Sequence, residues 1–287
     1  MSQGVQAFSL FALSSLCFSS GTRQVYTRPV LTAITREVSP SIAKCELTHM
    51  DRQGIDYQEA VRQHGIYVQL LRDLGCRVIV LPAEQDLPDS VFVEDAALVL
   101  DEVALLMRPG AASRRPEVDS IAEALAPHRE CLRIAAPGTV DGGDVLRVGR
   151  DIFVGLSSRS NEAGIAQMRT ALAPHGYRVT SIQTRDCLHL KTAVTALDAH
   201  SLLINREWVD PEPFGGYELV DIDPSEPFAA NVVPVGQALI HAEHFPRTRE
   251  LLLARSLDVR PVVASELAKA EGAVTCCSLI FESSVAV

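Results

Sequence analysis

The 287-residue sequence lacks the signatures of several protein classes. It contains no run of about 20 apolar residues, so we expect no membrane-spanning helix. It has no CxxC pair, which argues against a structural zinc site. It also has no GxGxxG, GxxxxGK(S/T) or GxSxG motif, so neither a nucleotide-binding loop nor a serine nucleophile is indicated. The formal net charge of −10 and the lack of a basic stripe argue against a nucleic-acid partner.

The cysteine pattern and the N-terminus indicate the compartment. The seven cysteines are odd in number and irregularly spaced, which disfavours a disulfide framework and favours a reducing compartment. Residues 6–18 resemble the apolar core of a secretory signal, but no Lys or Arg precedes them and no clean small-residue cleavage site follows. We therefore predict a cytoplasmic protein in which residues 1–23 are a disordered N-terminal extension and residues 24–287 form a single domain.

Helical patterns recur along the chain. The clearest begins at Asp56, a good N-cap, and ends at Gly75, which suits a left-handed C-terminal position. Val61, His64 and Leu71 are predicted to share one face of this helix. Further helices are predicted at 113–126, at 160–173, weakly at 211–215, and after residue 246.

Short apolar segments typical of strands follow each helix. They lie at 76–82, 131–137, 177–182, 217–222 and 259–264. Each is followed by a polar loop and then by two apolar segments that suggest a hairpin. The last copy lacks its second hairpin strand, which residues 25–35 are able to supply. The chain is thus interpreted as about five copies of strand, loop, strand, strand and helix, closed into one radial α/β array that protects its strand edges.

Polar and acidic residues gather at the same point of every copy, in the loop before the hairpin. In a radial array these loops meet at the central axis, where they would form one acidic pocket that contains a histidine and a cysteine. The residues concerned are Asp89, Glu94, Asp95, Asp141, Gly142, Gly143, Asp144, Asp186, His189, Glu226, Asn231, Cys276 and Cys277.

A cysteine and a histidine are the candidates for covalent chemistry. A thiolate is a strong nucleophile whose pKa falls beside a cation, so either Cys276 or Cys277 is a candidate; the alternative is a small buried apolar residue. His189 lies between Leu188 and Leu190, and strand alternation would turn those leucines to the opposite face. It is then either a general acid and base or a hydrogen-bonded core histidine.

Carboxylates and arginines complete the candidate site. Asp141 stands in TVDGGDVL, either to orient an imidazole or substrate or to begin a turn. Glu94 and Asp95 lie in a run that otherwise indicates a strand, so they need a cation, and a planar guanidinium pairs well with carboxylates. Arg114 and Arg159 precede helices and are either exposed or available to a substrate carboxylate.

Taken together, these residues resemble the dimethylarginine dimethylaminohydrolase family of the pentein, or guanidino-group-modifying, superfamily. The resemblance runs from about residue 25 to the C-terminus. It implies the pentein fold, a five-fold pseudosymmetric α/β propeller of ββαβ units. The matching segments are LPDSVFVED (87–95), RPGAASRRPEVD (108–119), DGGDVL (141–146), FVGLSSRSNEAG (153–164), LHLKT (188–192), AAN (229–231) and SELAKAEGAVTCCS (265–278).

The resemblance also implies roles for individual residues. Cys276 would be the nucleophile because the family's cysteine stands two residues before a serine, here Ser278. His189 would be the catalytic histidine and Asp141 the acidic third member. The substrate-binding residues it implies are Asp95 for the guanidinium, Asp89 and Glu94 in the same loop, Arg114 and Arg159 for the α-carboxylate, and the carbonyls of Leu47 and Ala270 for the α-amino group.

The implied reaction is hydrolysis of an Nω-methylated L-arginine to L-citrulline and methylamine or dimethylamine through a covalent S-alkylthiouronium. The implied partner is a small cationic substrate, with no metal or cofactor, and a homodimer is left open. The flap at 39–50 and Ala270 depart from the family pattern, which leaves the guanidine substituent open. The alternatives are deimination of arginine or of another small guanidine, and a non-catalytic pentein that binds a partner.

Overall fold

Five three-stranded sheets contain the fifteen strands of residues 27–286, the part of the chain that this computed structural model describes. The predicted extension at 1–23 lies outside the described residues. In every sheet a middle strand pairs antiparallel with an inner strand and parallel with an outer strand. The inner strands are β3 (Ala97–Val99), β6 (Val145–Val148), β9 (Val194–Ala196), β12 (Val232–Val235) and β15 (Leu279–Ala286).

The ring closes where the two ends of the described chain meet. Strand β1 pairs antiparallel with β15, with Ala33 opposite Ile280, so the N-terminal strand completes the C-terminal sheet as predicted. The middle strands are β1 (Thr27–Arg36), β4 (Val103–Leu106), β7 (Asp151–Leu156), β10 (Ser201–Ile204) and β13 (Ala238–Ala242). The outer strands are β2 (Arg77–Leu81), β5 (Glu130–Arg133), β8 (Arg178–Gln183), β11 (Glu218–Asp221) and β14 (Asp258–Val262).

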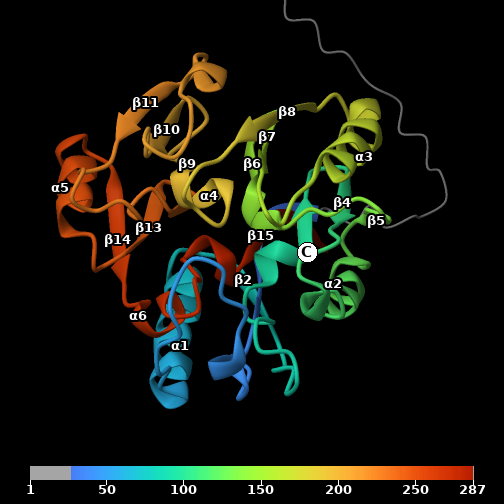
Figure 1. The fold of residues 1–287 in the computed structure, drawn as a ribbon. Helices are drawn as coiled ribbons and strands as arrows, with labels where there is room; N and C mark the ends of the chain where they lie inside the picture. Colours follow the sequence, from blue (N-terminus) through green and yellow to red (C-terminus); the bar gives the residue numbers. More distant parts are fainter. Residues whose placement is uncertain (1–26, 287) are drawn as a thin grey trace, which may run out of the picture.

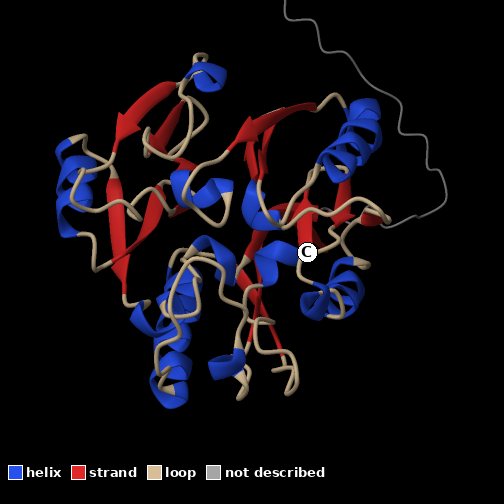
Figure 2. Cartoon of the chain, in the orientation of Figure 1, coloured by secondary structure: helices blue, strands red, loops and turns tan. Residues whose placement is uncertain are grey.

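Helices on the rim connect middle strands to outer strands, because parallel neighbours require a crossover (Figure 1). They are α1 (Tyr57–Asp73), α2 (Glu117–Leu125), α3 (Glu162–Leu172) and α5 (Pro246–Ala254). In the fourth repeat the crossover contains only a 3-10 turn, η6 (Glu212–Phe214), which agrees with the weak helix pattern there. Figure 2 shows helix and strand alternating around the molecule, as the repeat predicts.

Helix α1 has the predicted capping residues, but its buried face differs in part from the predicted one. The Asp56 side chain accepts from the Glu59 N–H at 3.1 Å, and Gly75 takes a positive φ of 89°, both as predicted. Val61 is 39% exposed, so its place on the inward face was wrong. The buried face consists of Ala60, Gln63, His64, Tyr67, Val68 and Leu71.

Short helical turns stand at the axis, each just before an inner strand. They are η2 (Val93–Ala96), η4 (Gly142–Asp144), α4 (Leu190–Ala193) and η7 (Thr275–Cys277). Turn η2 contacts both η4 and η7, and α4 contacts η4. The predicted meeting of loops is therefore confirmed for these four repeats. The remaining short helices are η1 (Ile42–Lys44), η3 (Ala112–Arg114), η5 (Ala173–His175) and α6 (Ser265–Ala268).

Three local expectations were wrong. Glu94 and Asp95 lie in a 3-10 turn rather than a strand, so their side chains diverge around the turn instead of alternating across a sheet. His189 lies in a bend and is the N-cap residue of α4, so the alternation argument for its leucine neighbours does not apply. Glu226 turns away from the axis, because its carboxylate accepts the Arg247 and Thr248 N–H groups at the start of α5.

Apolar side chains fill the wedges between neighbouring sheets. In one wedge Leu105 of β4, Ile152 of β7 and Met168 of α3 belong to the same buried cluster. No helix within residues 27–286 has the length and apolarity needed to cross a membrane.

Candidate active site

A small buried cavity of about 20 Å³ lies where the axial turns meet, and we call it the charged cavity. Cys276, His189 and Asp95 all line it, although they are far apart in the sequence and lie in or beside the turns that precede the inner strands of three different sheets. The full lining is Glu46, Asp89, Phe92, Asp95, Arg114, Arg159, Leu188, His189, Ala270, Glu271, Gly272 and Cys276. Most of the residues chosen from the sequence are thus brought together.

His189 is held by Asp141. The His189 Nε2 atom lies 3.2 Å from the Asp141 Oδ2 atom, and Asp141 is fully buried. The other Asp141 oxygen accepts the Gly110 N–H at 2.8 Å, and the Asp141 N–H donates to Ser160 Oγ at 3.1 Å. This carboxylate is therefore fixed from three sides and orients the imidazole ring.

The glycine pair after Asp141 permits a close approach of the axial turns. A Cβ atom at Gly143 would collide with His189 Nδ1 and with Asp95 Oδ1, and the Gly143 N–H donates to that Asp95 oxygen at 2.8 Å. A Cβ atom at Gly142 would collide with the Glu94 carbonyl oxygen. Both positions therefore require glycine because the axial turns leave no room for a side chain.

Asp95 is an ionised carboxylate in the charged cavity. Its Oδ2 atom lies 2.6 Å from Nη1 of Arg114, and both side chains are nearly inaccessible to solvent. Burial opposes ionisation, but Arg114, His189 and the Gly143 N–H outweigh it and lower the pKa of Asp95. A second planar cation could use the same carboxylate face.

The two arginines differ in how many partners they already have. Every guanidinium nitrogen of Arg114 donates within the protein: to Asp95, to Glu117, and to the carbonyls of Asp89 and Phe92. Arg159 donates to Thr48 Oγ1 at 2.9 Å, and its Nη1 atom lies 3.9 Å from Asp141. Among the described residues, Arg159 therefore keeps more N–H donors free for a ligand than Arg114 does.

Cys276 is a neutral thiol in this structure. Burial, and then the carboxylates of Glu94 and Asp95, raise the pKa of Cys276 to about 12. Its sulfur accepts the Ala273 N–H at 3.4 Å. Cys277 points instead at the Ala273 carbonyl, 3.6 Å away, in the apolar core, and burial raises its pKa well above the usual value of a thiol.

His189 is charged at neutral pH. Burial opposes the imidazolium, but Asp95, Asp141 and Asp144 outweigh it and raise the pKa of His189 to about 9. The resting site therefore holds a thiol, an imidazolium and ionised Asp95.

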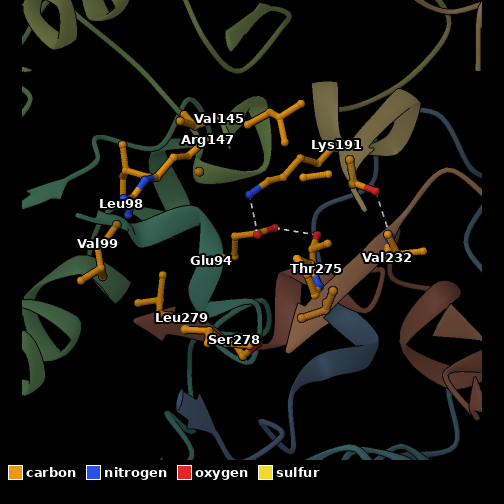
Figure 3. Close-up of a pocket in the computed structure, with 18 of the residues that line it drawn as sticks. Glu94, Leu98, Val99, Val145, Arg147, Lys191, Val232, Thr275, Ser278 and Leu279 are labelled. Atoms are coloured by element: carbon orange, nitrogen blue, oxygen red, sulfur yellow. Dashed lines mark hydrogen bonds and ion pairs between the residues drawn. The ribbon is translucent and has the colours of Figure 1, made fainter. Parts of the chain in front are cut away.

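Glu94 lies on the other side of the turn from Asp95, in a second cavity of about 350 Å³ that we call the open cavity. Its carboxylate pairs with Lys191 Nζ at 2.5 Å and accepts from Thr275 Oγ1 at 2.8 Å, as Figure 3 shows. Leu98, Val99, Val145 and Val232 give this cavity apolar walls. Glu94, which the resemblance placed in the substrate loop, does not line the charged cavity.

The flap closes over the charged cavity near Glu46. The Glu46 N–H donates to Asp89 at 3.1 Å, and the Glu46 carboxylate accepts from Ser113 Oγ at 2.5 Å. Asp89 is buried, which raises its pKa. Leu47 follows in the flap, half-buried, and Ala270 is buried at the opposite wall.

Some residues that support the site escaped the sequence analysis or received no role in it. Asn231 holds the nucleophile turn, because its side chain bonds Thr275 twice and also the Lys191 carbonyl. Asp144, fully buried, accepts from the Leu190 N–H and from the hydroxyls of Ser157 and Ser160. The position of Asn231 and Asp144 in the axial loops was the only sequence feature that pointed to the site. Their hydrogen bonds join distant loops, and such bonds leave no local sequence pattern.

Three groups in the charged cavity have the spacing of a metal site. One ligand atom each from Asp95, Asp141 and His189 lie within 4.8 Å of one another. Arg114 already neutralises Asp95, and the raised pKa of His189 favours its protonated form, which cannot bind a metal. The cluster therefore suits a carboxylate–imidazolium pair better than a divalent cation.

Known proteins share both the sequence and the fold. Residues 44–212 match the family described as N,N dimethylarginine dimethylhydrolase, eukaryotic. The dimethylarginine dimethylaminohydrolase of Streptomyces coelicolor is 39% identical over 253 residues, covering 88% of this chain and 97% of the relative. The enzyme of that name from Pseudomonas aeruginosa is 37% identical over 228 residues, covering 79% of this chain and 90% of the relative.

Solved structures agree. The Pseudomonas aeruginosa protein, as a cysteine-to-serine variant in complex with citrulline, superposes with a TM-score of 0.84 at 34% identity, covering 88% of this chain and 99% of its own. The N-terminal domain of ArgZ, a cyanobacterial arginine dihydrolase, superposes at 0.76 and 20% identity over 88% of this chain and 97% of its own, which shows the shared pentein fold alone. The chain belongs to the dimethylarginine dimethylaminohydrolase family.

Proposed function

We propose that this protein hydrolyses Nω-methylated L-arginine to L-citrulline and methylamine or dimethylamine. One observation carries the proposal: Cys276, His189 and Asp95 converge on one buried, charged cavity from the axial turns of three separate repeats. A nucleophile, an acid and a carboxylate for a planar cation are the groups that this reaction requires. The relatives named above carry the same activity in their names.

The bound substrate would activate the nucleophile. A thiol with a pKa of about 12 is protonated at neutral pH because it is buried and because the carboxylates of Glu94 and Asp95 lie near it. A guanidinium placed between Asp95 and Cys276 brings a positive charge next to the sulfur and lowers that pKa, so that the thiol proton leaves to water. A fall of about 4 units corresponds to about 5 kcal/mol of added attraction, which is within reach for charges in contact inside a protein.

His189 would supply and then remove a proton. The Cys276 thiolate attacks the guanidinium carbon, and the bond from that carbon to the methylated nitrogen breaks. The His189 imidazolium gives its proton to the departing amine, which leaves a covalent S-alkylthiouronium. Neutral His189 then takes a proton from water, and the resulting hydroxide attacks the same carbon. The carbon–sulfur bond breaks, and the hydroxyl proton of the intermediate passes to the leaving sulfur, which releases citrulline and restores the Cys276 thiol.

The geometry revises two of the implied substrate contacts. Because every nitrogen of Arg114 has a protein partner, we assign Arg114 to holding Asp95 and leave the α-carboxylate to Arg159. Glu94 is assigned to the Lys191 pair. A cavity of about 20 Å³ has room for about one water molecule, so the flap must move before a substrate enters.

The test is citrulline release from asymmetric dimethylarginine, monomethylarginine and arginine, measured side by side. Wild-type protein should release citrulline from the methylated substrates. Cys276→Ser and His189→Gly should each lose the activity.

Cys277→Ser is the matched control, because Cys277 faces the apolar core, and it should keep most of the activity. Release from arginine alone would replace the proposal with deimination. No release from any of the three would overturn it. A homodimer and a cytoplasmic location stay predictions.

A further inference from the structure

Two backbone carbonyls beside the charged cavity have no hydrogen-bond partner within residues 27–286. They belong to Ala270, which lines the cavity and is only 3% exposed, and to Leu47, which is half-buried and follows the lining residue Glu46 in the flap. A buried carbonyl that lacks a protein donor requires another one, and a substrate ammonium is such a donor. These are the carbonyls that we assign to the α-amino group, so a role for any residue that orients them rests on the proposed function.

Glu271 connects these two carbonyls, although it had no role in the sequence analysis. Its carboxylate accepts three consecutive flap N–H groups: Thr48 at 2.9 Å, His49 at 2.6 Å and Met50 at 2.6 Å. Its backbone has a positive φ of 57°, a conformation that costs a non-glycine residue energy and tends to persist at functional sites. Glu271 also lines the charged cavity.

Each carbonyl shares a peptide unit with an N–H group connected to Glu271: the Thr48 N–H, which donates to the Glu271 carboxylate, and the backbone N–H of Glu271 itself. The Thr48 N–H belongs to the same planar unit as the Leu47 carbonyl, so the bond to Glu271 turns that carbonyl away from the carboxylate. The Glu271 N–H donates to the Ala268 carbonyl at 3.1 Å, which fixes the unit that carries the Ala270 carbonyl. One residue therefore sets both peptide planes.

We propose that Glu271 is the positioning residue of the α-amino subsite and sets the preference for substrates that carry an α-amino group. The side chain holds the flap carbonyl and the backbone holds the wall carbonyl, so the two acceptors stay ready for one ammonium. Glu271 touches neither the guanidinium nor the nucleophile in this role. Its removal should affect substrate binding and leave the chemical step largely unchanged.

The test compares asymmetric dimethylarginine with its des-amino analogue, which has the same guanidine and carboxylate. Glu271→Ala should raise KM for the amino acid about tenfold, the loss of about 1.4 kcal/mol of binding. It should change kcat less than about threefold, and it should leave KM for the analogue nearly unchanged. Glu271→Gln keeps one acceptor oxygen, so its KM for asymmetric dimethylarginine should lie between those of wild-type protein and Glu271→Ala.

Ser113→Ala is the matched control, because it removes another flap contact, to Glu46, without touching either peptide plane. It should keep the wild-type preference for the α-amino group. Equal losses on both substrates, a fall in kcat alone, or no change in Glu271→Ala would each overturn the inference.

A binding measurement separates this inference from the proposed function. Calorimetric titration of L-citrulline and of 5-ureidopentanoate, its des-amino analogue, requires no turnover. If wild-type protein released no citrulline but preferred the amino acid ligand, and Glu271→Ala lost that preference, the reaction would be wrong and the subsite right. If wild-type protein bound both ligands equally, the subsite would be wrong whatever the activity.

Discussion

The two cavities at the axis differ in size and in chemistry, and two adjacent residues divide them. Asp95 lies in the charged cavity of about 20 Å³ with Cys276 and His189. Glu94 lies in the open cavity of about 350 Å³, among apolar walls and beside Lys191. The larger cavity lacks the nucleophile and the histidine, so converging titratable groups mark the reactive end more reliably than volume does.

The 3-10 geometry of η2 explains this division. A turn of about three residues sends neighbouring side chains in widely different directions. The partners then differ: Asp95 meets a guanidinium and a backbone N–H, whereas Glu94 meets a lysine and a threonine hydroxyl. The same pair of carboxylates thus serves chemistry on one side and structure on the other.

The most direct way to break this comparison is to neutralise each carboxylate in turn. Asp95→Asn should lower kcat/KM for asymmetric dimethylarginine by about 1000-fold or more, because the cation loses its charged partner in a buried site. Glu94→Gln should lower it less than about tenfold. Steady-state kinetics on protein with a verified thermal transition measures both, and similar losses in the two variants would contradict the division.

Alkylation of Cys276 tests whether the charged cavity keeps its thiol neutral in the absence of substrate. With a pKa of about 12, its thiolate fraction and hence its rate with iodoacetamide should rise about 100-fold from pH 7 to pH 9 in substrate-free protein. Peptide mass spectrometry gives the rate at each cysteine, and half-buried Cys131 should react faster than Cys276 at pH 7. A rate at Cys276 that levels off below pH 9 would rule out the neutral thiol.

Stability should depend on the open cavity through its ion pair. Lys191→Met should lower the free energy of unfolding by about 3 kcal/mol, because it leaves Glu94 charged and poorly solvated. Arg147→Met, in the same cavity but paired with exposed Asp101, should cost less than about 1 kcal/mol. Urea unfolding measures both. Adding Glu94→Gln to Lys191→Met should restore part of the lost free energy of unfolding. A further decrease in the double variant would argue against a stabilising Lys191–Glu94 ion pair.

The charged cavity should make stability depend on pH. The pKa of His189 is raised from 6.5 to about 9 on folding, so its contribution is fully present below pH 6.5 and is lost as pH rises through 9. The free energy of unfolding of wild-type protein relative to His189→Gln should therefore fall by about 3 kcal/mol between pH 6 and pH 10. A difference that stays constant or grows over this range would contradict a charged His189 in the resting site.

Most of the fold could be predicted from the chain because its signals are local. An apolar period between an N-capping residue and a glycine marks a helix, as it does between Asp56 and Gly75. Five repetitions of the same strand and helix unit then imply a ring. The errors were also local: Glu94 and Asp95 imitate a strand because a 3-10 turn is too short to leave a periodic pattern. Val61 was misplaced because its burial depends on which neighbour packs against α1.

The site could be predicted in composition but not in detail. Cys276, His189, Asp141 and Asp95 were identified and do line or support one cavity. The choice of Arg159 over Arg114 for a substrate carboxylate depends on which donors are already occupied, and that requires coordinates. The same holds for the pairing of Glu271 with Thr48, which are 223 residues apart.

The sequence by itself determined the repeated unit, the ring and the set of reactive side chains, because periodicity and residue type are properties of short segments. Only the tertiary structure decided which carboxylate faces which cavity, which arginine keeps donors for a ligand, and how far burial and neighbouring charges shift the pKa values of Cys276 and His189. The reason is that hydrogen bonding, desolvation and Coulomb interaction act between atoms a few ångströms apart, whatever their separation along the chain.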